Sequence, residues 1–208
     1  MKTPIKIDLV ADLICPWCYL GKTRLEQAMA NKRDQYEFSY TLLPFQLYPK
    51  LPEEGSPLSD FKHKRRPGAG RAILAEAKET GITIDYKKID RMPNSYQALK
   101  LMYLASGSEK QAPFVQKLYK AYFEEGIDIG KRDVLMDFAL ELRMDSKVLR
   151  RFDDPNWDAT AFQSIMDKFR SEGVTNVPTI IFNDQFPVIG VQPIQNLYRY
   201  FKRLENAS

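Results

Sequence analysis

The sequence predicts an α/β domain that is interrupted by a long block of helices. Three patterns carry this prediction: a β-α-β pattern opens the chain, amphipathic helical stripes fill its middle, and a β-β-α pattern closes it. A chain of 208 residues is long enough for one large domain with an insertion. We therefore expect residues 1–56 and 173–208 to form one discontinuous domain and residues 57–172 to form an α-helical insertion.

The first unit of the fold is predicted by two stretches of alternating residues. Apolar residues alternate with polar ones from Ile5 to Asp12, which favours a strand with one face more buried than the other. A helical spacing follows that ends near Asn31, and residues 36–45 alternate again. The strands of such a β-α-β unit pair in parallel, with the helix crossing one face of the sheet in a right-handed sense.

The only two cysteines of the chain lie in the segment Cys15-Pro16-Trp17-Cys18, where the first strand passes into the first helix. Proline suits the first helical position, so Cys15 is the expected N-cap. We expect its sulfur to face the N–H groups of Trp17 and Cys18, where the partial positive charge of the helix favours a thiolate. Cys15 is then the attacking group, and the less exposed Cys18 resolves the mixed disulfide.

Three other interpretations of the two cysteines have less support. A zinc site needs four ligands, and His63 is the only histidine that the chain can add, so no metal site is expected. Two buried thiols that act as small hydrophobic residues would not need a proline between them at a strand-to-helix junction. A static disulfide would close a loop too short to constrain the unfolded chain much.

The middle of the chain carries a series of helical patterns. Gly81 and Gly126 follow two of them and are typical helix stops. Each apolar stripe is more typical of a protein core than of a cofactor site. The stretch 58–81 is expected to be partly helical, and the further helical segments are 95–105, 111–125, 134–142, 148–152 and 162–169.

The end of the chain returns to strands. Residues 179–182 and 186–189 are apolar runs separated by a turn at Asn183-Asp184, and an amphipathic helix with Ile194 and Leu204 at its ends follows. Pro187 cannot donate to a ladder, so it is expected at the start or on the edge of its strand.

Composition excludes several classes of function. The chain has 31 basic and 27 acidic residues and a net charge of +4, which is too mild an excess for a nucleic-acid-binding surface. The densest basic run, residues 62–66, is expected to be a solvated loop rather than a grip for an anionic ligand. No apolar run approaches the roughly 20 residues that a bilayer requires. The N-terminus shows no secretory signal, which favours a cytoplasmic protein.

Four motifs occur in order along the chain. They are Asp12-x-x-Cys15-Pro16-Trp17-Cys18-Tyr19-x-Gly21-Lys22, Pro44-Phe45-x-Leu47-x-Pro49, Ala121-Tyr122-Phe123-x-Glu125-Gly126-Ile127-Asp128-Ile129 and Gly173-Val174-x-x-Val177-Pro178-Thr179. With a CxxC at the first helix and a helical insertion, they resemble the DsbA-like branch of the thioredoxin superfamily. More narrowly, they resemble FrnE-like cytoplasmic oxidoreductases, which are relatives of 2-hydroxychromene-2-carboxylate isomerases and kappa-class glutathione transferases. The resemblance implies a thioredoxin fold with a large α-helical insertion.

The resemblance also implies roles for individual residues. It implies that Pro178 follows a cis peptide bond and presses the Val177 backbone beside the disulfide, where it would offer its polar groups to an extended substrate strand. Trp17 stands where DsbA proper has histidine, so a less extreme oxidant is expected. Its ring is either an exposed platform for unfolded substrate or a packed side chain.

Three further residues are candidates for supporting or substrate-binding roles beside Pro16 and Trp17. Asp12 either tunes the cysteines electrostatically or caps the loop. Asn94 either lines the cleft or is the N-cap of the helix that follows. Gln192 lies where the glutathione-dependent relatives usually place an acidic residue, and it is not acidic.

The resulting functional hypothesis is a thiol-disulfide oxidoreductase or protein disulfide isomerase that works through the Cys15–Cys18 pair. It requires no cofactor, and its expected partners are protein or small-molecule thiols and disulfides, with glutathione as a candidate co-substrate. Whether the chain is a monomer or a homodimer stays open. One alternative is a glutathione-dependent isomerase or transferase, although such relatives generally carry serine at the Cys15 position. Another is a redox-sensing binding module.

Overall fold

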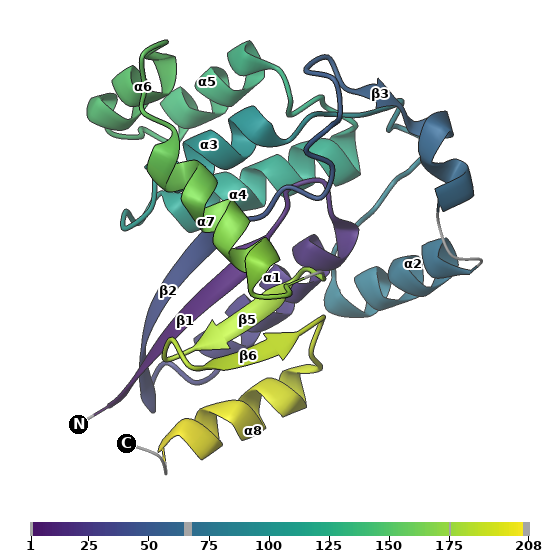
Figure 1. Cartoon of the computed structure of the whole chain (residues 1–208). Coiled ribbons are helices and arrows are strands. Elements are labelled where there is room, and N and C mark those ends of the chain that lie inside the picture. The colour runs from purple at the N-terminus through teal and green to yellow at the C-terminus, as the bar shows by residue number, and fades with distance from the viewer. Residues whose placement is uncertain (1, 65–67, 175, 206–208) are drawn as a thin grey trace.

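The computed structural model describes residues 2–64, 68–174 and 176–205. Its main sheet has the strand order β2-β1-β5-β6. The central strand β1 pairs in parallel with β2 and antiparallel with β5, and β6 completes the sheet as an antiparallel edge strand (Figure 1). The four strands are β1 (Thr3–Ala11), β2 (Tyr36–Pro44), β5 (Thr179–Phe182) and β6 (Phe186–Ile189).

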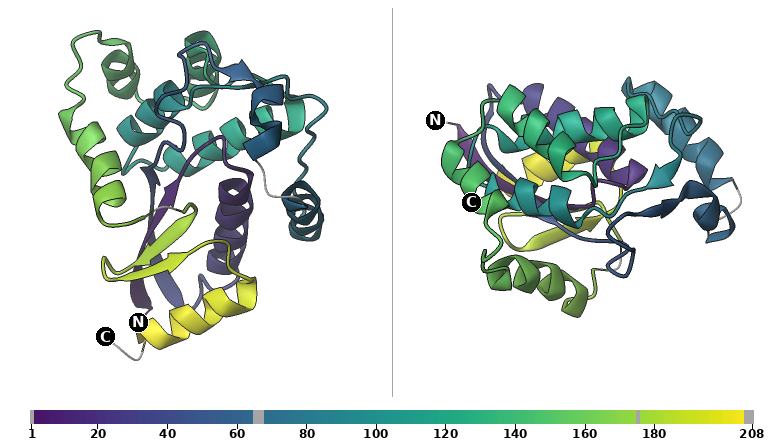
Figure 2. Two further views of the ribbon diagram at one scale, coloured as in Figure 1. Left: turned by 45° about the vertical axis from the view of Figure 1, so that its right-hand side comes forward. Right: turned by 90° about the horizontal axis from the view of Figure 1, so that it is seen from above.

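The predicted β-α-β unit is confirmed, with helix α1 (Pro16–Ala30) between the parallel strands β1 and β2. Ile5, Ile7 and Leu9 of β1 belong to the main core, whereas Val10 packs with Phe169 on the other face of the sheet. This alternation follows from the period of two in a strand. The two faces are therefore covered separately, by α1 and α8 on one side and by α7 on the other (Figure 2).

The segment between β2 and β5 forms a helical layer beside the sheet (Figure 1). All the predicted helical segments are present in it, and Gly81 ends α2 while Gly126 follows η2. Its helices are the 3₁₀ helix η1 (Leu58–Lys64), α2 (Ala69–Thr80), α3 (Tyr96–Leu104), α4 (Gln111–Lys120), the π-helix η2 (Ala121–Glu125), α5 (Arg132–Glu141), α6 (Ser146–Asp153) and α7 (Thr160–Ser171). The C-terminal helix α8 (Ile194–Glu205) returns to the sheet.

Two features of this layer were not predicted. The short strands β3 (Ser56–Pro57) and β4 (Arg91–Met92) pair antiparallel to form a second sheet. The predicted helix 111–125 changes from α to π geometry at Ala121. A two-residue strand carries no readable period, and apolar spacing does not distinguish an α-helix from one that continues as a π-helix.

A buried glutamine joins the helical layer to the sheet. The Gln111 side chain accepts from the Leu42 backbone N–H at 3.0 Å and donates to the Leu42 carbonyl at 2.9 Å. It donates in addition to the Met102 carbonyl at 3.0 Å. Because buried polar groups must be paired, these bonds fix where α4 meets β2.

The basic run of residues 62–66 lies partly outside the described residues. Arg65 and Arg66 belong to the undescribed part, and the side chains of residues 62–64 are likewise not described. The expectation of a solvated loop there stays a prediction.

Candidate active site

The two cysteines lie at the start of α1, where the sequence placed them. Cys15 is the N-cap with an extended backbone (φ −93°, ψ 114°), and Pro16 takes the first helical position. The Cys15 carbonyl accepts from the N–H groups of Cys18 at 3.0 Å and Tyr19 at 3.2 Å. Cys15 is 6% exposed, Cys18 is completely buried, and both are free thiols. Cys15 is therefore the sulfur that a substrate can reach first.

The expected environment of the Cys15 sulfur needs a correction. We expected it to face the N–H groups of Trp17 and Cys18, but in the described structure it makes no capping hydrogen bond. The Cys18 N–H is already bonded to the Cys15 carbonyl. The thiol instead donates to the Val177 carbonyl, with 3.9 Å between sulfur and oxygen. Val177 thus contacts the redox pair through its backbone.

The loop that carries Val177 is continuous with the sheet. The Val177–Pro178 peptide bond is cis, as the resemblance implied. The Pro178 carbonyl accepts from the Gly190 N–H at 2.8 Å, and the Thr179 hydroxyl donates to the Asn176 carbonyl at 2.8 Å. The Pro178 carbonyl is therefore held just beyond the end of the β5–β6 ladder, while the preceding carbonyl is turned to the sulfur.

The buried sulfur of Cys18 holds its proton firmly. Burial raises the pKa of the Cys18 thiol well above its ordinary value, and the neighbouring Cys15 raises it further. The Asp12 backbone N–H acts in the opposite direction, as a donor that lowers the same pKa. The buried Cys18 thiol is therefore less readily ionised than a free cysteine.

Asp12 is a buried carboxylate directly behind residues 15–18, which we call the redox turn after the hypothesis that their two cysteines exchange disulfides. It accepts from the Leu47 N–H at 2.7 Å and from the Ile14 N–H at 3.4 Å, and it is 0% exposed. Burial raises its pKa to about 6, against the lowering effect of the Leu47 hydrogen bond. The Tyr119 hydroxyl donates to the Asp12 carbonyl at 3.2 Å. Asp12 thus joins the redox turn to the loop after β2, and its ionised form also raises the pKa of Cys18.

Comparison with protein families agrees with this geometry. The family model described as the DSBA-like thioredoxin domain matches residues 6–202, which includes both cysteines and Pro178. The chain belongs to this family. A curated relative, the uncharacterized protein YwbO of Bacillus subtilis, is 23% identical over 181 residues, covering 86% of this chain and 88% of that protein.

Solved structures show the same fold at low sequence identity. The probable DsbA oxidoreductase of Streptomyces coelicolor has a TM-score of 0.84 at 20% identity, covering 98% of this chain and 91% of that one. A 2-hydroxychromene-2-carboxylate isomerase has a TM-score of 0.72 at 17% identity, covering 97% of this chain and 95% of that one. The cytosolic disulfide reductase DsbM of Pseudomonas aeruginosa has a TM-score of 0.69 at 16% identity, covering 98% of this chain and 100% of that one. The fold is the DsbA-like thioredoxin fold.

Other residues of the family motifs lie around the redox turn in different ways. Pro16 and Trp17 are partly exposed, and the Trp17 ring packs against the main core. The N-cap of α3 is Ser95, so the expectation of Asn94 as the N-cap is wrong by one residue. The Asn94 amide oxygen accepts from the Tyr96 N–H and from the Gln46 amide, both at 2.9 Å, and so joins the start of α3 to the loop after β2. The same asparagine lines a small cavity with Glu53.

Gln192 follows the segment of Gly190 and Val191 that contacts the Pro178 loop and α1. Its amide donates to the Ile189 carbonyl at 3.2 Å and to the Gly190 carbonyl at 3.4 Å. The residue lines a mainly apolar cavity between β6 and α8, together with Phe186 and Tyr200.

Two residues near the site were not singled out by the sequence. Tyr119 belonged to a helical stripe that is typical of a core, and nothing local indicates that its hydroxyl reaches Asp12. Gly21 belongs to the first of the four motifs, and in the structure it packs against Pro178. A glycine inside a helix weakens it, so Gly21 carried a signal that a packing reason was present.

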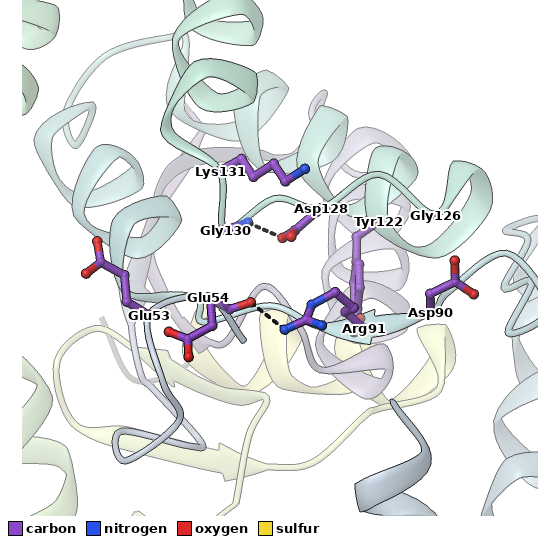
Figure 3. Close-up of a pocket in the computed structure, with 9 residues that line it drawn as sticks. All are labelled: Glu53, Glu54, Asp90, Arg91, Tyr122, Gly126, Asp128, Gly130 and Lys131. Atoms are coloured by element: carbon purple, nitrogen blue, oxygen red, sulfur yellow. Dashed lines mark hydrogen bonds between the residues drawn. The ribbon is translucent and has the colours of Figure 1, made fainter. Parts of the chain in front are cut away.

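A larger cavity lies in the helical layer, away from the cysteines. It has a volume of about 620 Å³, and both cysteines lie outside its lining residues. Figure 3 shows charged side chains around it, with Arg91 bonded to the Glu54 carbonyl at 2.9 Å and Asp128 bonded to the Gly130 N–H at 2.9 Å. Its lining residues are Glu53, Glu54, Asp90, Arg91, Tyr122, Gly126, Asp128, Gly130 and Lys131.

The described part of the chain has neither a metal-binding cluster nor a helix that could span a membrane. In ranges 2–64, 68–174 and 176–205, histidine, cysteine and acidic side chains do not gather in threes where they could hold a metal ion. Over the same ranges, no helix has the length and apolar character that a membrane span requires.

Proposed function

We propose that this chain is a thiol-disulfide oxidoreductase whose Cys15–Cys18 pair cycles between dithiol and disulfide. One observation carries the proposal: the reachable thiol of Cys15 contacts the Val177 carbonyl at 3.9 Å, with the buried thiol of Cys18 one helical turn behind it. An extended substrate can pair with the loop backbone at this point while its sulfur meets Cys15.

The exchange balances within the pair and its substrate. The Cys15 thiolate attacks one sulfur of a substrate disulfide, that S–S bond breaks, and the leaving substrate thiolate takes up a proton. Cys18 then loses its proton and attacks the Cys15 sulfur, which releases the second substrate thiol. Two electrons and two protons pass to the substrate, and the protein is left as the Cys15–Cys18 disulfide. An external thiol or dithiol reverses the process and restores the reduced pair.

The substrates we propose are protein and small-molecule thiols and disulfides. Glutathione is included because the related fold of DsbM has been solved with glutathione. We further propose a FrnE-like, cytoplasmic enzyme without a resident cofactor. The absence of histidine at the Trp17 position supports a potential that is less oxidising than that of DsbA, since no imidazolium stabilises the thiolate there.

The trapping of a mixed disulfide tests this mechanism. With Cys18→Ser, a peptide disulfide should leave one peptide half attached to Cys15, seen by mass spectrometry as a stable adduct, because no second thiol can release it. The wild type should instead accumulate as the intramolecular disulfide. Cys15→Ser is the control and should trap nothing. Trapping at Cys18 in that variant, or no adduct in Cys18→Ser, would contradict the assigned roles.

A second candidate function is supported by the shared fold with 2-hydroxychromene-2-carboxylate isomerase. A glutathione-dependent isomerase would use Cys15 to hold glutathione and would have no need of a second thiol. The two functions separate in Cys18→Ser, which leaves isomerase turnover intact but abolishes a dithiol cycle. A redox-sensing module would show a saturable oxidation without turnover in the wild type.

A further inference from the structure

Gly21 lies inside α1, six residues after Cys15, against the loop that carries Val177. A Cβ atom placed on it would lie 2.7 Å from Cγ and 3.3 Å from Cβ of Pro178, and 3.7 Å from a methyl group of Val191. Ordinary contacts of such an atom begin at about 3.4 Å. Any side chain at position 21 must therefore displace its neighbour.

The group that would be displaced is a proline ring, which is part of the backbone rather than the end of a flexible chain. The ring cannot rotate away, because its closure fixes the side chain to the main chain. Relief of the contact therefore requires the whole Val177–Pro178 segment to move by several tenths of an ångström, or α1 to move instead.

Helix α1 is held in place by contacts on either side of Gly21. Directly beside Gly21, the Lys22 ammonium is buried and bonds to Glu26 at 2.7 Å and to Gln116 at 3.0 Å. Two positions before it, the Tyr19 hydroxyl donates to Glu124 at 2.7 Å and its ring stacks on Tyr119 with 5.0 Å between centroids. The loop has anchors of its own, which include the hydrogen bonds from Gly190 and Thr179 and the packing of Val177 against both hydrophobic clusters. A side chain at position 21 therefore changes the separation between two segments that are each anchored elsewhere.

We propose that Gly21 is a positioning residue that sets the approach of the Val177 backbone to the Cys15 sulfur. This inference rests on the proposed function, because it concerns the same thiol exchange. The sulfur–oxygen separation of 3.9 Å is already close to the outer limit of a hydrogen bond to sulfur, so a displaced loop loses that contact. Substrates that must pair with the Val177 backbone are affected most, and small disulfides that touch only the sulfur are affected least.

The chain contains a matched control for this substitution. Gly70 is the second residue of helix α2, and a Cβ atom there would meet none of the described residues within 4 Å. Glycine to alanine inside a helix favours the helix by about 1 kcal/mol through propensity alone, at either position. The contact with Pro178 is therefore the feature that distinguishes Gly21→Ala from Gly70→Ala.

The experiment compares two reactions of the reduced protein. We would measure the rate constants for a peptide disulfide and for a small aromatic disulfide, in the wild type, Gly21→Ala and Gly70→Ala. The proposal expects the ratio of peptide to small-disulfide rates to fall about tenfold in Gly21→Ala, since small displacements of a positioned group cost such factors. Gly70→Ala should keep the wild-type ratio. A wild-type ratio in folded Gly21→Ala overturns the proposal.

A second comparison decides the matter if Gly21→Ala does not fold. Pro178→Ala removes the Cγ atom, so Gly21→Ala in that background should fold and keep the ratio of Pro178→Ala itself. A double variant that stays unfolded, or whose ratio falls a further tenfold or so, overturns the proposal. A wild-type protein that exchanges with neither disulfide instead overturns the proposed function, which is a separate outcome.

Discussion

The redox turn and the charged cavity of the helical layer differ in almost every physical respect. The cavity is roomy, at about 620 Å³, and is lined by six charged side chains, but it presents no thiol. The redox turn is nearly closed, and Cys15 is only 6% exposed. Cavity volume alone would draw attention to the helical layer rather than to the cysteines. The thiol that we propose as the reactive group lies where a helix N-terminus meets a backbone carbonyl, so our proposal follows the chemistry of the residues rather than the volume of the cavity.

The largest expected effects are on the rate of disulfide exchange, and they should follow substitutions in the redox turn but not in the cavity. Cys15→Ser should reduce the exchange rate with a peptide disulfide to the uncatalysed background, because a hydroxyl cannot replace the attacking thiolate. Arg91→Ala, in the cavity, should leave the rate within about twofold of the wild type, since changes away from the reacting atoms leave an exchange step largely unchanged. Stopped-flow measurement of peptide thiol release provides the test. An Arg91 variant as inactive as Cys15→Ser would place the chemistry at the cavity.

A large effect on stability is expected from Asp12. Burial raises its pKa from 3.8 to about 6, which corresponds to about 3 kcal/mol of unfolding free energy. The native state binds the proton more tightly than the unfolded state, so this contribution is present below pH 4 and is lost as pH rises to about 6. The wild type should therefore lose unfolding free energy between pH 4.5 and pH 7.5, and Asp12→Asn should lose less of it. Urea unfolding at both values measures the difference.

The control for this titration is the same substitution at an exposed site. The hydrogen bonds of Thr160 lower the pKa of Asp158, so its contribution to stability is lost only as pH falls through still lower values. Asp158→Asn should therefore leave the wild-type change between pH 4.5 and 7.5 unaltered. If the unfolding free energy of Asp12→Asn changed between pH 4.5 and 7.5 as much as that of the wild type, the buried carboxylate would not titrate in this window.

Two further variants should lose similar amounts of stability but differ in their reduction potentials. Tyr119→Phe removes the hydrogen bond to the Asp12 carbonyl, and Asp145→Ala removes the cap of α6, which bonds to the Lys147 N–H at 2.7 Å. Each should cost about 1 kcal/mol of unfolding free energy. Only Tyr119→Phe should shift the reduction potential, because only Tyr119 lies against the redox turn. Glutathione titration of both variants checks this, and an equal shift in Asp145→Ala would contradict it.

The order of elements could be predicted because each carries a local signal. Alternation predicted β1 and β2, Pro16 predicted the start of α1, and Gly81 predicted the end of α2. Pro187 was expected at a strand start or edge, and it lies in the edge strand β6. These features depend on residues a few positions apart, whose backbone preferences are fixed by their own chemistry.

The contacts that build the candidate site could be predicted only in part. The cysteines and Pro178 were found from motifs, and the resemblance placed the Val177 backbone beside the cysteines. No local pattern shows this contact, because Val177 is 162 positions from Cys15. The contact of Gly21 with Pro178 and that of Tyr119 with Asp12 also join distant segments. Such pairs depend on the packing of helices against the sheet, which no local pattern reports.

The redox equilibrium of the purified protein in graded glutathione buffers tests the central claim most directly, with thiols trapped and weighed by mass spectrometry. The proposed function predicts a reversible Cys15–Cys18 disulfide with a potential in the range of about −120 to −270 mV, where known catalytic pairs lie. At the midpoint, half of the wild-type molecules should carry two trapped thiols and half should carry none, whereas Cys18→Ser should form no intramolecular disulfide. A pair that never forms the disulfide, with Cys15 holding glutathione whether or not Cys18 is present, would contradict the dithiol cycle.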